Sequence, residues 1–208
     1  MHAPARPESD GGDFKPMAEQ ARVQLAAVSK SDPNFSEIDF LRRAAQVYSE
    51  TLAAEGAMQV AAVQASVTPA FLLRLQARFG HWRDSGETRI LTDLVCDSPL
   101  ILKAVVGDKN ESLTVRFTGS AVRYTKDDDS GVAVEGSVDP ISFCEFATFI
   151  RPADSLTPDS PATGMANVCP SCGAPLGEGE PTCGFCGAAS RRLGGTWLLD
   201  RISESAYT

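Results

Sequence analysis

The sequence lacks several patterns that would assign a protein to a common class at once. Its 208 residues contain no apolar run of about eighteen residues, so no segment is expected to span a membrane. No basic head is followed by an apolar stretch at the start, which argues against a secretory signal, and residues 1–16 are expected to form a flexible leader. We therefore expect a cytoplasmic protein with reduced thiols, with peripheral attachment to a membrane as the alternative.

Catalytic motifs are equally scarce. The chain has only two histidines, and His81, the one beyond the leader, falls at the end of a predicted helix, where a surface role or a contact with the helix dipole accounts for it. There is no Gly-rich phosphate loop, no Ser-His-Asp order and no His-x-x-Glu metal motif. Asp93, Asp97 and Glu145 could enter a cleft, but no spacing links them to a nucleophile. No catalytic residue is assigned, and the protein is predicted not to be an enzyme.

Positive charge is also in short supply. The chain has 19 Lys and Arg against 27 Asp and Glu, a formal net charge of -8. An acidic body repels phosphate backbones, so nucleic-acid binding is disfavoured from the outset. Hydrophobic residues make up 43% and charged residues 22% of the chain, proportions typical of a folded domain and not of a disordered one.

Residues 15–80 have the periodicity and the boundary signals of helices. A first helix is expected to stop before the turn at Asp32 and Pro33. The second begins at Ser36, an N-cap that Asp39 can answer as a capping box. The third begins at Thr68, which precedes a proline at the first helical position. Two of these helices are predicted to end at glycines, Gly56 and Gly80, and a short helix is expected between them.

After residue 80 the hydrophobic period changes to two, which predicts β-strands. The Asp-rich sequence 126–131 between two of them is typical of a hairpin turn, and because it lacks the ligand spacing of an EF-hand, solvated carboxylates explain it better than calcium. Helices followed by strands predict an α+β fold, with helices packed on one face of an antiparallel sheet. The predicted strands lie within residues 88–95, 100–106, 112–125, 132–136, 141–150 and 196–202.

Four of the six cysteines fall in the stretch "CPSCGAPLGEGEPTCGFC", as two Cys-x-x-Cys pairs each followed by glycine. A Cys-x-x-Cys turn points two sulfurs to one side, and two such turns supply the four thiolates of a tetrahedral zinc site. We therefore predict that Cys169, Cys172, Cys183 and Cys186 bind a structural Zn²⁺, because four sulfurs leave no open position for water or substrate. The module has little apolar content of its own, so the metal is expected to supply its folding energy.

Other roles for the cysteines fit the sequence less well. A redox site usually has one Cys-x-x-Cys at the start of a helix, and a disulfide framework is unexpected in a reducing compartment. A zinc ribbon can also bind nucleic acid, but this one has Glu178 and Glu180 and no Lys or Arg between its ligands. The remaining Cys96 and Cys144 fall in strands and are expected to be small buried side chains.

Four stretches, in their order, are similar to those of the Tim44-like domain family, which is named for a peripheral translocase subunit of the mitochondrial inner membrane and has many bacterial members. Some bacterial members carry a Cys-Pro-x-Cys-Gly ribbon just before a Trp-containing last strand, as here. One departure is Ala147, where the family often has Trp in its Glu-x-Trp-x-Phe-x-Arg strand. The stretches are "SDPNFSEIDFLRRAAQVYSETLAAEG", "LTVRFTGSAVRYTKDDDSGVAVEG", "CEFATFIRP" and "TWLLDRI".

The resemblance implies a cone of helices on a curved antiparallel sheet, the nuclear transport factor 2-like or cystatin-like fold. Residues 17–151 and 195–208 would form this α+β domain, 152–168 a linker, and 169–194 a zinc ribbon inserted before the last strand. That fold hosts both binding modules and enzymes such as ketosteroid isomerases, so it does not choose a function by itself.

Our leading hypothesis is a non-enzymatic, zinc-containing binding or scaffold module. A cleft between helices and sheet would receive a protein partner or a lipid or other apolar ligand, in a role linked to membrane-associated transport or assembly. The candidate lining residues are Leu41, Tyr48, Leu72, Phe117 and Phe149.

Two alternatives come from other functional classes. A small-molecule enzyme of the ketosteroid-isomerase type would use the same cleft and would need converging carboxylates, for example Asp93 with Glu145. A zinc-ribbon adaptor would bind nucleic acid in a salt-sensitive manner.

Overall fold

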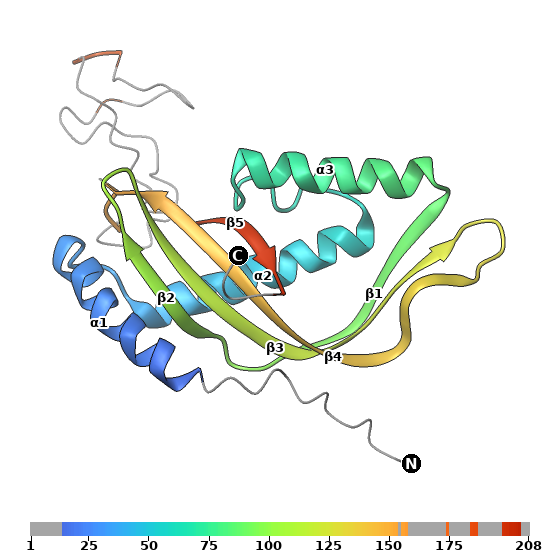
Figure 1. Ribbon diagram of the computed structural model, residues 1–208. Coiled ribbons are helices and arrows are strands. Elements are labelled where there is room, and N and C mark those ends of the chain that lie inside the picture. The colour runs from blue at the N-terminus through green and yellow to red at the C-terminus, as the bar shows by residue number, and fades with distance from the viewer. Residues whose placement is uncertain (1–13, 154, 158–173, 175–183, 187–196, 205–208) are drawn as a thin grey trace.

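The computed structural model describes residues 14–153, 155–157, 174, 184–186 and 197–204. Within them, helices come first and strands follow, as the periodicity predicted. The elements are α1 (Lys15–Ser31), α2 (Glu37–Ala57), α3 (Pro69–Asp84), β1 (Glu87–Cys96), β2 (Leu100–Val106), β3 (Asn110–Asp127), β4 (Ala133–Pro152) and β5 (Leu198–Ser203). They form an α+β fold in which the helices pack on a curved antiparallel sheet (Figure 1), which confirms the predicted fold class.

The helices begin where their caps predicted. The Ser36 hydroxyl accepts the N–H of Asp39 at 3.3 Å, and the Thr68 hydroxyl accepts the N–H of Phe71 at 3.2 Å. The end of α2 differs slightly, because the helix continues past Gly56 and stops where Met58 adopts a left-handed conformation with φ 52°. A non-glycine residue takes over the role that a helix-ending glycine usually has.

The short helix predicted between α2 and α3 is wrong, since residues 61–66 form turns. Their hydrogen bonds span three residues, as from Val63 N–H to the carbonyl of Val60 at 3.1 Å. The end of this segment is bonded instead to β5: Leu199 donates to the carbonyl of Ser66 at 3.0 Å, and Thr68 donates to the carbonyl of Leu199 at 2.9 Å. Pairing with a strand competes with helix formation and prevails here.

Two long strands organise the sheet. β3 and β4 pair antiparallel from Asn110↔Pro152 to Lys126↔Ala133, and β5 continues the sheet beyond the second half of β4. The other edge of β3 is shared by β2 along its first half and β1 along its second half. The strands predicted at 132–136 and 141–150 are therefore one strand, which two irregularities in register interrupt.

The core lies between the helices and the concave face of the sheet. Figure 1 shows α2 running across this face, with α1 beside β2 and α3 above the sheet next to β5. Because β4 and β5 are neighbours while 45 sequence positions separate Pro152 from Trp197, the chain leaves the sheet and returns to it between two adjacent strands. That is the place where the zinc module was predicted to be inserted.

Candidate functional site

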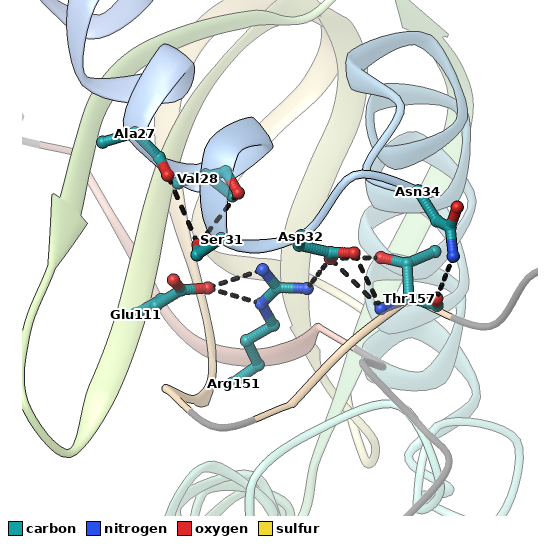
Figure 2. Close-up of polar contacts among 8 residues, drawn as sticks. All are labelled: Ala27, Val28, Ser31, Asp32, Asn34, Glu111, Arg151 and Thr157. Carbon is teal, nitrogen blue, oxygen red and sulfur yellow. Dashed lines mark hydrogen bonds and ion pairs between the residues drawn. The ribbon is translucent and has the colours of Figure 1, made fainter.

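A fully buried arginine joins the ends of several elements. Arg151, near the end of β4, donates from Nε to Glu111 Oε2 at 2.6 Å and from Nη1 to Asp32 Oδ2 at 2.6 Å (Figure 2). Its side chain is 0% exposed, and those of the two carboxylates are 1% and 2% exposed. Glu111 lies at the start of β3 and Asp32 caps the end of α1. One guanidinium thereby connects the first helix to the two longest strands.

Local structure holds Asp32 in position for this contact. Its own N–H donates to the carbonyl of Val28 at 2.8 Å, which closes the last turn of α1. Its carboxylate also accepts the N–H of Thr157 at 3.1 Å and the hydroxyl of Thr157 at 2.7 Å. Asn34 donates to the carbonyl of Thr157 at 3.2 Å, so the chain beyond β4 is tied to the turn after α1 (Figure 2).

Two aromatic rings complete the environment of the arginine. The guanidinium of Arg151 lies 4.6 Å from the ring centroid of Trp197 and 5.9 Å from that of Phe35. The Phe35 and Trp197 rings meet edge to face with centroids 6.2 Å apart. Trp197 directly precedes β5, so both ends of the excursion between β4 and β5 meet at Arg151. We refer to Asp32, Phe35, Glu111, Arg151 and Trp197 together as the Arg151 clasp.

Electrostatics in the clasp favour the ionised form of Asp32. Burial alone raises the pKa of this carboxyl, but hydrogen bonds from Thr157 and Arg151 and the charge of Arg151 outweigh burial and hold the pKa below its usual value. The clasp therefore contains two buried carboxylates around one cation, and each depends on the arginine for its charge compensation.

A second buried polar network lies farther along the concave face. The Tyr48 hydroxyl on α2 donates to Glu145 Oε2 at 2.5 Å, and Arg123 on β3 forms a short ion pair with the other oxygen of Glu145. The Tyr48 ring stacks on Phe117, with centroids 4.1 Å apart and planes 5° apart. Burial first, and then the charge of Glu145, raise the pKa of the Tyr48 hydroxyl, so this group stays protonated.

Glu55 and two further arginines extend this network. Burial raises the pKa of Glu55, against the opposing charges of Arg78 and Arg89. Arg78 Nη1 donates to Glu55 at 2.7 Å, and Arg89 donates to Thr125 at 3.2 Å. Buried N–H groups of Arg89 and Arg123 have no hydrogen-bond acceptor, and these guanidiniums lie over the rings of Trp82 and Phe143. Each interior carboxylate in this network has an arginine partner, Arg123 for Glu145 and Arg78 for Glu55.

The carboxylates singled out from the sequence do not converge. Glu145 is buried and held by Tyr48 and Arg123, whereas Asp93 is exposed and adopts a left-handed conformation with φ 53°. Asp97 is exposed and accepts the Thr118 hydroxyl at 2.8 Å. His81 is exposed near the end of α3, in agreement with the surface role expected for it.

The expected apolar cleft is filled by core side chains. Tyr48, Phe117 and Phe149 are 0%, 1% and 1% exposed. Leu41 and Leu72 are half-buried and pack against the same core. These five residues stabilise the fold, and they do not line an open binding surface. A pocket of about 440 Å³ instead lies where α1 meets β2 and β3, lined by Phe14, Lys15, Ala18, Glu19, Arg22, Leu100 and Arg116.

Exposed apolar side chains gather at one end of β4. They are Val132, Val134, Val138 and Ile141, with exposed fractions of 61%, 55%, 60% and 44%. Two of them lie on bulges: Val134 is an extra residue between Ala133 and Glu135, and Val138 belongs to residues 138–140, which stand opposite the single residue Val122 of β3. We call residues 127–141 the β4 arm; its turn projects at the right of Figure 1, away from α1 and β5.

The predicted zinc ligands fall largely outside the described residues. Cys169, Cys172 and Cys183 do so, while Cys186 is an exposed turn residue. Within the described ranges no three His, Cys, Asp or Glu side chains are grouped to hold a metal, which leaves the zinc prediction untested. The expectation for Cys96 is wrong, because β1 ends there and its side chain is exposed; Cys144 is half-buried.

Comparison with known proteins identifies the family. The Tim44-like domain model matches residues 21–162, and this range is more than half of the 208 residues. The chain therefore belongs to the Tim44-like domain family, as the order of its motifs suggested. Asp32, Glu111 and Arg151 all fall inside the matched range, so the clasp is built largely from the family domain.

Other comparisons add little. One matching solved structure is described as the intermembrane space region of chloroplast protein ARC6; it is 11% identical, covers 52% of this chain and 84% of that chain, and has a TM-score of 0.35. A similarity this low supports no inference about the present chain. Among curated proteins, none matches by sequence. In the part of the chain that the structure describes, no helix combines the length and the hydrophobicity that a membrane crossing requires.

The clasp predicts a large cost for removing its cation. Arg151→Met leaves Asp32 and Glu111 buried without compensation, and we expect the free energy of unfolding to fall by about 3–5 kcal/mol in urea titrations. Arg151→Lys, which keeps the charge but not the forked geometry, should be intermediate. The control is Arg42→Met, because Arg42 forms an ion pair whose side chains are 71% and 67% exposed, and its loss should change little. Equal effects at Arg42 and Arg151 would contradict this role.

The lowered pKa of Asp32 predicts a specific dependence on pH. Its folded pKa is below its unfolded value, so its stabilising contribution is complete above the ordinary carboxyl pKa of about 3.9 and is lost as pH falls through the folded pKa. The stability difference between the wild type and Asp32→Asn should therefore be constant from pH 7 to 5 and shrink toward pH 3. Urea midpoints measured at each pH test this, and a difference that does not change down to pH 3 would refute it.

Proposed function

We propose that this chain is a non-enzymatic binding domain that engages a protein partner through the β4 arm. The observation that carries the proposal is the placement of four exposed branched side chains at and next to the two bulges of β4, with Val134 and Val138 on the bulges themselves, while the interior is filled. Apolar side chains that the fold does not bury are common at interaction sites when they cluster. Apolar side chains that bulges hold in solvent contribute no buried surface to the stability of the fold.

The state of the interior argues against a reaction there. The carboxylate of Glu145 is bound by Tyr48 and Arg123, and Glu55 is paired with Arg78. A catalytic acid or base needs an unoccupied proton position next to bound substrate. The second carboxylate that such a reaction would need, Asp93, is exposed and does not converge with the buried Glu145. For these reasons a binding role is favoured over the ketosteroid-isomerase type of enzyme. A link to membrane-associated transport or assembly is proposed on family membership alone.

We further propose that the chain between β4 and β5 contains a structural zinc ribbon at 169–194, preceded by a linker at 152–168. Four thiolates from Cys169, Cys172, Cys183 and Cys186 are a donor set that suits tetrahedral Zn²⁺. The proposed domain of 17–151 and 195–208 is then one folded unit with an insertion. Because the excursion between β4 and β5 begins and ends at the Arg151 clasp, a folded ribbon within it would restrict the chain on both sides.

The zinc proposal predicts metal in the purified protein. We expect about one Zn²⁺ per chain by elemental analysis, and its loss in the double variant Cys169→Ser/Cys183→Ser. The helical far-ultraviolet signal should remain, since α1 to α3 do not depend on the ribbon. The control is Cys96→Ser, which lies outside the motif and should retain zinc. A metal-free wild type, or equal zinc in the wild type and the double variant, would refute the site.

The binding proposal predicts that partner capture depends on the arm. Tagged full-length protein with Val134→Ser and Val138→Ser should lose proteins that the wild type retains in affinity purification followed by mass spectrometry. The matched control is Val23→Ser with Leu73→Ser, because these helix residues are 75% and 66% exposed but lie outside the arm. Identical protein sets from the wild type and the arm variant would exclude the arm as the binding surface.

A further inference from the structure

We infer that the β4 arm binds a positively charged segment of a partner protein, one in which Lys or Arg side chains alternate with apolar ones. This inference rests on the proposed function and specifies the chemistry of the partner. It follows from two properties that the arm combines: a single sign of charge and several exposed apolar side chains.

The charge of the arm is wholly negative. Residues 127–141 read "DDDSGVAVEGSVDPI", with five carboxylates and no Lys or Arg. Lys126 directly precedes the arm, so the stretch 126–141 carries one positive and five negative charges, a net of -4. The stretch 126–141 thus carries half of the formal charge of -8. Such a field attracts cationic segments and repels anionic ones.

The carboxylates differ in what they already bind. Asp127 accepts the N–H and hydroxyl of Ser130 at 2.7 and 2.6 Å, and Asp128 accepts the hydroxyl of Thr88 at 2.6 Å. These two shape the hairpin turn. Glu135 and Asp139, by contrast, are exposed: Glu135 lies between Val134 and Val138 in the sequence, and Asp139 directly follows Val138. They are the carboxylates best placed to meet cations that accompany apolar side chains.

The spacing of the exposed groups matches an alternating segment. Along β4, Val134, Glu135, Val138, Asp139 and Ile141 place carboxylates between apolar side chains. A partner that buries the valines also brings its cations next to Glu135 and Asp139, where partial desolvation strengthens each ion pair. Across the described residues, no other strand pairs with residues 133–141 on the edge opposite β3, so the approach to this edge is open there.

A second copy of the chain fits the same surface poorly. A twofold contact through the arm would bring five carboxylates against five others, with only Lys126 from each chain to compensate them. Like charges brought together at an interface are strongly unfavourable. Pro140, which lacks an N–H, and the mutual hydrogen bonds of Ser137 and Asp139 at 2.9 and 3.1 Å also interrupt the edge, and such interruptions limit edge-to-edge pairing of identical strands.

The test uses full-length protein and three labelled peptides of ten residues. These peptides are five Lys-Val repeats, five Lys-Ser repeats and five Glu-Val repeats, and binding is followed by fluorescence anisotropy at low and high salt. We expect the Lys-Val peptide to bind about tenfold more tightly than either of the others, and its affinity to fall about tenfold between 50 and 500 mM salt. Because Lys-Ser carries the same charge, it separates attraction by net charge from recognition by the arm.

Two matched charge reversals locate the site. Glu135→Lys with Asp139→Lys should weaken Lys-Val binding by about tenfold or more. Glu19→Lys with Asp108→Lys changes the net charge equally at exposed residues outside the arm and should have little effect. Val134→Ser with Val138→Ser should reduce Lys-Val binding toward the Lys-Ser level. Urea midpoints close to the wild-type value establish that each variant is folded.

Several results would overturn the inference. These are equal weakening by the two charge reversals, equal binding of Lys-Val and Lys-Ser, preferred binding of Glu-Val, or no binding of Lys-Val. A concentration-dependent dimer in sedimentation that the valine variant abolishes would replace the cationic partner with a second copy. A different result would refute the proposed function: the arm variants would retain the same set of proteins in affinity purification as the wild type. A partner that the arm captures but that lacks cationic segments would refute this inference alone.

Discussion

The burial of one guanidinium against two carboxylates is the constraint on which the arrangement of this fold depends. Arg151 has no exposed surface, so its charge must be compensated inside the protein. Its partners come from the end of α1 and the start of β3, and its aromatic neighbours from the turn before α2 and the residue before β5. A correct pairing at Arg151 therefore requires all these segments to be in their native places at once. A fold assembled around such a contact has few near alternatives, because a displaced element leaves a charge unpaired.

The second polar network places a limit on function. In a nuclear transport factor 2-like fold the space between helices and sheet is where a ligand is usually sought. Here Tyr48 stacks on Phe117 and its hydroxyl donates to Glu145. Aromatic rings and a paired carboxylate therefore fill that space. The exposed side chains on the bulges of β4 lie outside it. A binding site on this chain is thus best sought on the surface of the sheet, at the bulged end of β4.

Much of the fold could be predicted because its signals are local. Ser36 and Thr68 mark helix starts by hydrogen bonds within four residues. The change of hydrophobic period predicted that strands follow helices, although α3 continues past Gly80 to Asp84 and β1 begins at Glu87. The contacts of the Arg151 clasp are not local. The contact of Asp32 with Arg151 spans 119 positions, and no pattern in one sequence links them, although both lie in stretches that resemble the family. The cleft prediction failed because apolar residues such as Phe117 and Phe149 have the same pattern whether they line a cavity or fill it.

The closeness of Arg151 and Trp197 also bears on how this protein can change over evolutionary time. The chain that departs after β4 and the chain that arrives at β5 meet side by side, so whatever lies between them forms a closed loop anchored at a fixed pair of points. Each doubling in the length of such a loop adds only about 0.6 kcal/mol to the entropy of closure. Segments of very different size can therefore be exchanged at this junction, and descendants of the same domain could gain or lose an accessory module there without redesign of the sheet.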